Sequence, residues 1–318
     1  MNKSILSRAQ GCLMGQLAGD SLGSLVEFKT PEEIRRLYPH GVKDLADGGI
    51  WQILAGQPTD DSEMALALAR ALVAQKTFDK EKIRAAYLDW FHSNPFDFGG
   101  TVAKALRDNR LTPESQANGA LMRVSPLGIF CARETITPEE LAHYAEQEAA
   151  LTHIHPICRQ ANILFVAAIA KAVRYGTDPE SLYQTLLAHA HALSVEPELL
   201  TTLIRAAQQP PDDYVHKQGW VLIAFQNAIW QLIHAQNLEE GIMNTVMQGG
   251  DTDTNAAIAG ALLGAVHGIE AIPERWQTII LNCRPDTGLP HVNHPRPKRF
   301  WPVDALELAT QLLLQTAT

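Results

Sequence analysis

The amino-acid sequence predicts an all-α fold, arranged as a single compact orthogonal multi-helix domain over residues 1–318. Apolar residues recur every three or four positions in many segments, which is typical of helices that pack on a core. Strand-like alternation of apolar and polar residues is nearly absent. We therefore expect about a dozen helices. The clearest segments are 62–75, 80–92, 138–150, 157–174, 219–234 and 254–268.

Helix start signals and loop composition support this assignment. Thr137 precedes Pro138 and two glutamates, and Asp178 precedes Pro179 and a glutamate. A capping residue followed by a first-turn proline and acidic residues predicts the start of a helix. The longer loops are rich in Pro, Gly and Asn but lack the low complexity of a linker, which favours one domain. These loops are 94–100, 109–119 and 283–300.

The composition is that of a folded, acidic protein. Hydrophobic residues make up 46% of the chain and charged residues 19%, which is ordinary for a globular protein. The net charge of −9 argues against nucleic acid as a general partner, because such a protein needs a basic face to meet phosphates. The four cysteines are scattered and form neither a zinc ribbon nor a redox motif, which fits a reducing cytoplasm.

We expect a cytoplasmic, soluble monomer without a membrane partner. The amino-terminal segment is interrupted by Gly11, Gly15 and Asp20 and lacks the continuous apolar core of a signal peptide. The most apolar internal run, 163–170, is far shorter than the ~20 residues that span a bilayer.

Two of the expected helices carry a stripe of small residues. Glycine recurs every four residues from Gly11 to Gly23, and the same spacing runs from Ala256 to Gly268. Each helical glycine costs about 1 kcal/mol relative to alanine, so the repetition predicts a close contact that compensates. The stripes could pack antiparallel on one another, which would place Asp20 and Glu27 beside the start of the second helix. Alternatively, each stripe could pack separately on bulky side chains.

Acidic residues and threonines cluster at the start of two expected helices, at 59–61 and 251–254. Hard oxygen ligands of this kind suit Mg²⁺ or Mn²⁺. If the clusters converge, four carboxylates and two threonines could serve two metal ions. Ordinary capping is the alternative. In that case Asp251 or Thr252 would cap one helix, and Asp60 and Glu63 would form a capping box on the other.

Six motifs together resemble the ADP-ribosylglycohydrolase family, which includes the dinitrogenase reductase-activating glycohydrolases and their animal counterparts. They occur in the family's order from about residue 10 to 276, and their combination is far more specific than any one of them. The motifs are GQLAGDSLGSLVEF (15–28), PTDDS (58–62), FDFG (96–99), NGALMR (118–123), LTHIHP (151–156) and GGDTDTNAAIAGALLG (249–264). The resemblance implies an all-α fold and removal of ADP-ribose from a modified acceptor.

The resemblance also implies a binuclear centre of two divalent metal ions, Mg²⁺ or Mn²⁺. Every position that matches a metal ligand of the family carries a suitable residue in this chain. By their motifs these ligands are Thr59, Asp60, Asp61, Asp251, Asp253 and Thr254.

Two further acidic residues match catalytic positions of the family. Glu27 matches an acidic residue near the metals and the scissile bond, whereas the sequence alone allows a solvated charge between Val26 and Phe28. Asp97 matches an acid proposed for substrate positioning or proton transfer, although a loop acid capping the next helix is the alternative. Which of the two moves the proton stays open.

The resemblance places substrate contacts at Asn118, Gly119 and His153. Without it, Asn118 and Gly119 would be a simple turn; with it, their backbone amides belong to the ADP-ribose cradle, where N–H groups can meet the pyrophosphate. His153 and His155 flank Ile154, and an isolated pair of this kind is more often structural. No role is assigned to His291 or His294.

These observations predict a hydrolase that cleaves the glycosidic bond at the distal ribose of an ADP-ribosylated protein or small molecule. ADP-ribosyl-arginine on protein is the first candidate substrate. Another linkage, to serine, a nucleobase or a metabolite, is the second, and a non-catalytic ADP-ribose-binding protein is the third. The intact set of ligands argues against the third, and the motifs do not reveal the acceptor pocket.

Overall fold

The computed structural model describes residues 3–314 and confirms the all-α prediction. Within this range the chain forms helices joined by loops, and the only β-type pairings are isolated bridges. The α-helices are α1 (Lys3–Gly23), α2 (Pro31–Leu37), α3 (Asp60–Gln75), α4 (Lys80–His92), α5 (Gly100–Arg107), α6 (Ser125–Cys131), α7 (Pro138–Ala149), α8 (Pro156–Tyr175), α9 (Pro179–Ala192), α10 (Pro197–Ala206), α11 (Val221–His234), α12 (Leu238–Val246), α13 (Thr252–His267), α14 (Glu274–Asn282) and α15 (Ala305–Leu314). Four 3-10 turns complete them: η1 (Leu121–Arg123), η2 (Ile269–Ala271), η3 (Lys298–Phe300) and η4 (Pro302–Asp304).

All six segments with clear periodicity are helices, with ends within a few residues of the expected ones. The start signals are also confirmed. Thr137 forms a reciprocal capping box with Glu140 at the start of α7, and the side chain of Asp178 accepts a hydrogen bond from the Ser181 amide at the start of α9. Local sequence therefore determines where these helices begin.

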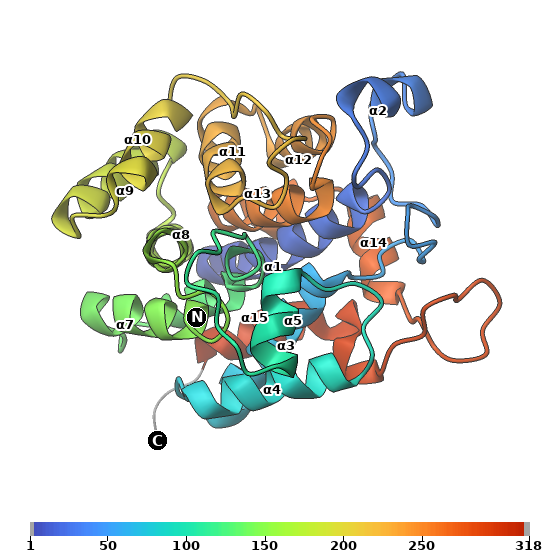
Figure 1. The fold of residues 1–318 in the computed structure, drawn as a ribbon, viewed down its shortest axis with the longest axis horizontal. Coiled ribbons are helices and arrows are strands. Elements are labelled where there is room, and N and C mark those ends of the chain that lie inside the picture. Colours follow the sequence, from blue (N-terminus) through green and yellow to red (C-terminus); the bar gives the residue numbers. More distant parts are fainter. Residues whose placement is uncertain (1–2, 315–318) are drawn as a thin grey trace.

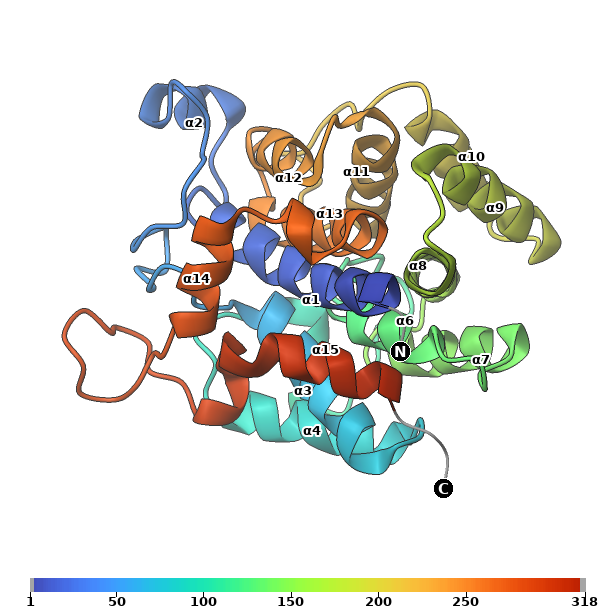
Figure 2. The ribbon, with the colours of Figure 1, turned by 180° about the vertical axis from the view of Figure 1, so that it is seen from behind.

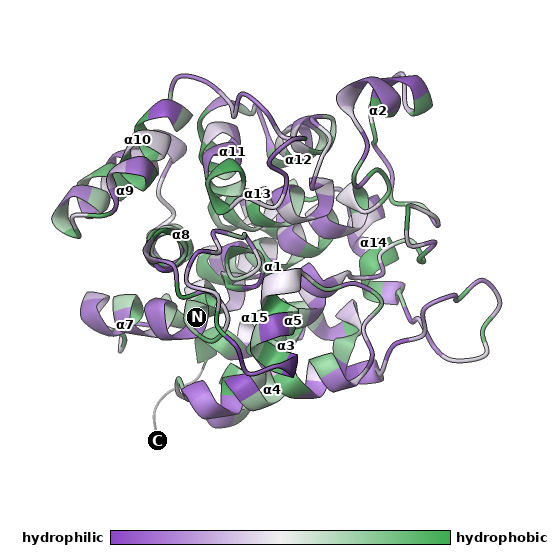
Figure 3. Ribbon diagram, in the orientation of Figure 1, coloured by the Kyte–Doolittle hydropathy of each residue, from purple (hydrophilic) through white to green (hydrophobic). Residues whose placement is uncertain are grey.

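Helices α1 and α13 lie side by side at the centre of the molecule (Figures 1 and 2). On one side of this pair lie α3, α4 and α15, and on the other lie α11 and α12; α7 to α10 form one end, and α2 and α14 the other. The outer helices α4 and α7 carry both polar and apolar residues (Figure 3), as expected for amphipathic helices that cover a core.

The two stripes of small residues pack against each other, and the helices run antiparallel. A Cβ atom added to Gly15 would lie 2.2 Å from the carbonyl oxygen of Gly260, and one added to Gly19 would lie 2.0 Å from that of Ala256. At these distances only glycine lets the two backbones approach so closely. The hydroxyl of Thr252 donates to the Gly23 carbonyl at 2.7 Å, which joins the end of α1 to the start of α13.

Helix α8 is long and apolar enough to cross a membrane by length and composition, and it is the one such helix in residues 3–314. Most of its apolar window, 67%, is buried inside the fold. It occupies the position of a core helix, in contact with α6, α7 and α13.

The capping box expected from Asp60 and Glu63 is wrong. Thr59 is the N-cap residue of α3 by position, and no side-chain capping bond is formed there. Glu63 turns into the core, where it binds Arg296 and accepts a hydrogen bond from Trp90. Likewise, Asp251 is the N-cap of α13 without a side-chain capping bond. Asp60, Glu63 and Asp251 are thus not used for capping, whereas Asp253 accepts a hydrogen bond from the Thr254 amide in the first turn of α13.

Candidate metal centre and active site

The two acidic helix starts converge on one cavity of about 330 Å³. Nine of the residues selected from the sequence line it, and Thr59 and Asp61 lie buried directly behind its wall. The antiparallel glycine contact fixes the end of α1 beside the start of α13. Asp20, near that end of α1, accepts hydrogen bonds from the backbone amides of Thr59 and Ser62 and so holds the start of α3 there as well. The nine lining residues are Glu27, Asp60, Asp97, Asn118, Gly119, His153, Asp251, Asp253 and Thr254.

The start of α13 and the segment after α1 form the first half of the site. Carboxylate oxygens of Glu27, Asp251 and Asp253 lie within 4.8 Å of one another, and all three residues are buried. The indole N–H of Trp51 donates to Glu27 at 2.8 Å and fixes its position. Glu27 therefore belongs to the group that could hold a cation, a place that the sequence did not assign to it.

The start of α3 forms the second half. The hydroxyl of Thr59 lies 2.9 Å from Asp20 and 3.0 Å from Asp61, and it can donate to either. Asp20 also accepts hydrogen bonds from the backbone amides of Thr59 and Ser62. One oxygen of Asp61, Oδ1, is buried without a hydrogen-bond partner in the described chain. An orphaned carboxylate oxygen of this kind fits a metal ligand.

The sequence predicted that Asp20 could lie beside the start of α13, but it assigned no role to this residue. It lies in the glycine stripe of α1 and is fully buried. Its carboxylate holds the first turn of α3, and therefore the backbone of the candidate metal ligands, in place. The signal for it was its position one residue after Gly19, at the point where the helices touch.

Burial and mutual repulsion raise the pKa of most of the cavity carboxyls. Desolvation, followed by the charges of Asp97 and Asp251, raises the pKa of Glu27 to about 8. Desolvation also raises the pKa of Asp97 to about 6 and that of Asp20 to about 6. For Asp60, Asp61 and Asp253 the pKa lies well above the ordinary value, again with desolvation as the largest cause.

Within residues 3–314, none of these carboxylates forms an ion pair with a Lys, Arg or His side chain. Buried carboxylates without a counter-charge are costly, and bound cations relieve the repulsion between them. The donor set consists of hard oxygens, which suits a divalent cation. The residues therefore fit a divalent metal centre.

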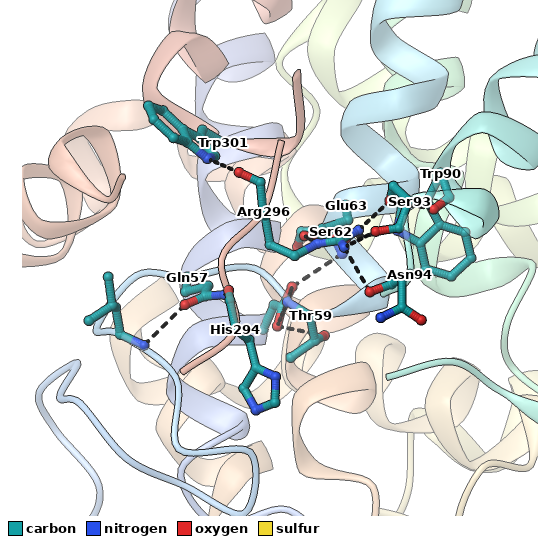
Figure 4. A network of polar contacts seen from close by, with 12 residues as sticks. Gln57, Thr59, Ser62, Glu63, Trp90, Ser93, Asn94, His294, Arg296 and Trp301 are labelled. Atoms are coloured by element: carbon teal, nitrogen blue, oxygen red, sulfur yellow. Dashed lines mark hydrogen bonds and ion pairs between the residues drawn. The ribbon is translucent and has the colours of Figure 1, made fainter. Parts of the chain in front are cut away.

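Asp97 lies on the loop between α4 and α5. Arg296 forms hydrogen bonds with the start of this loop (Figure 4). The guanidinium of Arg296 donates to both oxygens of Glu63, at 2.7 and 2.8 Å, and to the carbonyls of Ser93 and Asn94. It thus joins the carboxyl-terminal loop, α3 and the segment that leads to Asp97. Sequence reasoning missed Arg296, because its loop gives no sign of which helix it contacts.

Asn118, Gly119 and His153 line one wall of the cavity, but their contacts differ from the expectation. The backbone N–H of Asn118 donates to the Gly219 carbonyl, so this amide is not free for a pyrophosphate. The side chain of Asn118 instead donates to Asp251 at 2.7 Å. Gly119 leaves room for His153, since an added Cβ would lie 3.1 Å from the imidazole.

The two histidines of the LTHIHP motif have different surroundings. His155 is the N-cap of α8, and its Nδ1 accepts a hydrogen bond from the Ile157 amide at 3.2 Å. His153 is fully buried, lines the cavity and has no partner at Nε2. The structural role expected for such a pair thus holds for His155, whereas His153 carries a buried polar atom without a partner in the described chain.

Comparison with known proteins identifies the chain. A model of the ADP-ribosylglycohydrolase family matches residues 1–293. The protein belongs to the ADP-ribosylglycohydrolase family. ADP-ribosyl-[dinitrogen reductase] glycohydrolase of Rhodospirillum rubrum is 30% identical over 285 residues, which is 86% of this chain and 90% of that protein. The solved structure of an ADP-ribosylglycohydrolase-related protein complex has a TM-score of 0.79 at 26% identity and covers 98% of both chains.

Other relatives of this glycohydrolase carry related names. ADP-ribosylarginine hydrolase Tri1 of Pseudomonas putida is 28% identical, over 85% of this chain and 73% of its own length. Human ADP-ribosylhydrolase ARH3 is 26% identical, over 86% of this chain and 88% of its own length. Together with the family match, these relatives establish the chain as an enzyme that hydrolyses ADP-ribosyl groups.

Proposed function

We propose that this glycohydrolase removes ADP-ribose from ADP-ribosyl-arginine on proteins, with two divalent cations, Mg²⁺ or Mn²⁺, held between the two acidic helix starts. The observation that carries the proposal is the set of buried carboxylates that face one cavity without a counter-charge from the described chain. The cations would be held by Thr59, Asp60, Asp61, Asp251, Asp253 and Thr254, with Glu27 close enough to join them. When bound, they supply positive charge that orients ribose hydroxyls.

The residues of the cavity divide the remaining chemistry between them. Cleavage of the C–N bond at the anomeric carbon of the distal ribose develops positive charge on the sugar, which nearby carboxylates stabilise. As the C–N bond breaks, a water oxygen bonds to this carbon and gives up one proton, and the leaving guanidine nitrogen takes up one proton. We assign this proton transfer to Asp97, because its pKa of about 6 suits a group that exchanges protons near neutral pH.

Glu27 is the other acid that could transfer the proton according to the sequence, but its position favours cation binding instead. It lies in the carboxylate group that could hold a cation, and its oxygen is fixed by Trp51. Asp97 lies on a loop at the cavity wall, outside the group of Glu27, Asp251 and Asp253, and its side chain is hydrogen-bonded to Asp60. We therefore assign cation binding to Glu27 and proton transfer to Asp97.

The cavity also favours a cationic acceptor such as arginine. None of the residues that line it is Lys or Arg, whereas Glu27, Asp60, Asp97 and others contribute carboxylates. Two exposed aromatic rings belong to its lining, Phe28 at 48% and Phe98 at 42% exposed. Aromatic faces and carboxylates together attract a guanidinium group. Phe28 also has a left-handed φ of 63°, a strained conformation of the kind found at functional sites.

The experiment compares wild-type protein with Asp253→Ala on arginine-, serine- and nucleobase-linked ADP-ribose, with Mg²⁺ or Mn²⁺. We expect release of ADP-ribose from the arginine conjugate that requires metal and falls by at least about a hundredfold in the variant. Asp108→Asn, which changes an exposed acid of an ion pair with Arg107, is the matched control and should keep full activity.

Other outcomes point to other functions. Cleavage of the serine or nucleobase conjugate alone would replace the arginine assignment. Binding of ADP-ribose without cleavage of any conjugate would favour a binding protein. Full activity of Asp253→Ala with metal still bound would refute the metal-centre proposal.

A further inference from the structure

A fully buried row of polar groups lies behind the wall formed by Gly119 and His153. Arg123, in η1, donates from Nε to Glu148 at 2.7 Å, from Nη1 to the Gly119 carbonyl at 3.1 Å and from Nη2 to the Thr152 hydroxyl at 2.9 Å. The same hydroxyl lies 2.8 Å from Nδ1 of His153. The side chains of Arg123 and Glu148 have no exposed surface. A buried charge is thus hydrogen-bonded directly to Gly119 and, through the Thr152 hydroxyl, to His153.

The direction of these hydrogen bonds is fixed by chemistry. A guanidinium can only donate, so the oxygen of Thr152 accepts from Arg123. The hydroxyl then has one hydrogen left, and Nδ1 of His153 is the one other partner that the described chain gives it. If Nδ1 instead carried a hydrogen and donated, the Thr152 hydroxyl hydrogen would be buried without an acceptor, which is unfavourable.

Nδ1 of His153 is therefore an acceptor, and a neutral ring then carries its hydrogen on Nε2. Burial, helped by the nearby charge of Arg123, lowers the pKa of His153 to about 3, which keeps the ring neutral. Nε2 is buried, has no partner in the described chain, and belongs to a residue that lines the cavity. The unused group at the wall is thus a hydrogen-bond donor.

We infer that Arg123 and Thr152 are positioning residues that fix His153 as an Nε2–H donor toward an oxygen of bound ADP-ribose. This inference rests on the proposed function for the identity of the ligand. Arg123 holds the two residues of the wall at once, because it binds the Gly119 carbonyl directly and His153 through Thr152. Neither Arg123 nor Thr152 belongs to the cavity lining, so both act through the residues of the wall rather than on the reacting atoms.

The first measurement needs no variant. Long-range ¹H–¹⁵N spectra of histidine-labelled wild-type protein distinguish the two neutral tautomers, and the His153→Gln variant assigns the signal. We expect His153 to be neutral at pH 7, with its hydrogen on Nε2. A hydrogen on Nδ1 in the wild-type protein would overturn the inference.

The second measurement removes the hydroxyl while keeping the shape of the side chain. Thr152→Val should move the Nδ1 signal of His153 and weaken ADP-ribose binding by about three- to tenfold, the effect of one lost hydrogen bond. Thr152→Ser restores the hydroxyl and should recover most of that affinity. Thr202→Val removes the hydroxyl of a threonine that bonds within its own helix, and it should bind as the wild type does. Equal affinity of Thr152→Val and wild-type protein would refute the role of Thr152.

These readouts separate the inference from the function on which it rests. A protein that cleaves no ADP-ribose conjugate but shows the Nε2–H tautomer, with a Thr152-dependent Nδ1 signal, would refute the proposed function and support the positioning role. A protein that cleaves the arginine conjugate with His153 in the other tautomer would do the opposite.

Discussion

This protein contains two kinds of buried carboxylate, one paired with an arginine and the other without a counter-charge. Glu63 and Glu148 each have an arginine at 2.7 Å, Arg296 and Arg123, and both pairs are almost completely buried. Asp61, two residues before Glu63, is equally buried, yet no Lys or Arg of the described chain pairs with it. Burying a charge without a partner is strongly unfavourable, so the missing partner of Asp61 indicates a functional role for this residue.

The contrast indicates where the chain supplies a counter-charge and where it leaves that to a ligand. Burial raises the pKa of Glu63, but Arg296 and Trp90 act against this effect. The pKa of Asp61 is raised by burial and further by Asp20 and Asp251, with only hydroxyl groups acting in the other direction. The first arrangement is structural. The second needs protons or cations from outside to be stable.

The largest effect is expected from Asp61→Asn, which removes a charge from the unpaired group and keeps the shape of the side chain. Release of ADP-ribose should fall by at least about a hundredfold. The metal-free variant should unfold at a higher urea concentration than the wild type, because a desolvated charge is gone. Activity assays and urea unfolding measure both effects. A variant that loses stability and keeps metal-dependent activity would show that Asp61, like Glu63, has a structural role.

The paired group should respond in the opposite way. Arg296→Met leaves Glu63 buried without a counter-charge, with only the Trp90 hydrogen bond remaining, and should cost about 3–5 kcal/mol of unfolding free energy. Adding Glu63→Gln to this variant should recover part of the loss, because the stranded charge is removed. The exposed pair Arg205 and Asp212 provides the control, and Arg205→Met should cost no more than about 1 kcal/mol. A small loss in Arg296→Met, similar to that of the control, would contradict the comparison.

The helices and the central contact of the fold could be predicted from the sequence, because their signals are local and periodic. The glycine spacing from Gly11 to Gly23 matches that from Ala256 to Gly268, and the structure confirms that the two stripes touch. The same contact brings Glu27 to the acidic start of α13. The two glycine patterns thus allowed for the contact between α1 and α13, whereas the proposed metal ligands came from the family motifs.

The partners of buried charges could not be predicted. Glu63 has the right spacing from Asp60 for a capping box, and nothing local shows that it binds Arg296, 233 residues later. Arg123 and Glu148 are 25 residues apart, on elements whose relative position depends on the whole fold. The donor and acceptor roles around Asn118 were likewise set by Gly219 and Asp251. Sequence patterns identify which residues carry chemistry, whereas the fold decides which of them are neutralised.

The smallest expected effect is the change of unfolding free energy with pH, which tests all the unpaired cavity carboxylates together. The folded-state pKa of Glu27 is raised to about 8 and that of Asp97 to about 6, so between pH 5 and 8 these carboxyls bind more protons in the folded chain than in the unfolded chain. The pKa of His153 is lowered to about 3 from 6.5, which acts in the opposite direction, but it is one group against several carboxyls with a raised pKa. Stability without metal should therefore fall as the pH rises through this range, by at most about 1.4 kcal/mol per pH unit for each excess proton.

Adding Mg²⁺ or Mn²⁺ should reduce or reverse this fall, since the cations compete with protons for the same carboxylates. Urea unfolding at pH 5, 6, 7 and 8, with a chelator or with added metal, measures both slopes. Asp61→Asn should flatten the metal-free slope, and Arg205→Met should leave it as in the wild type. Metal-free stability that rises from pH 5 to pH 8 would mean that the cavity carboxylates are already neutralised by the protein itself, and the distinction from Glu63 and Glu148 would then disappear.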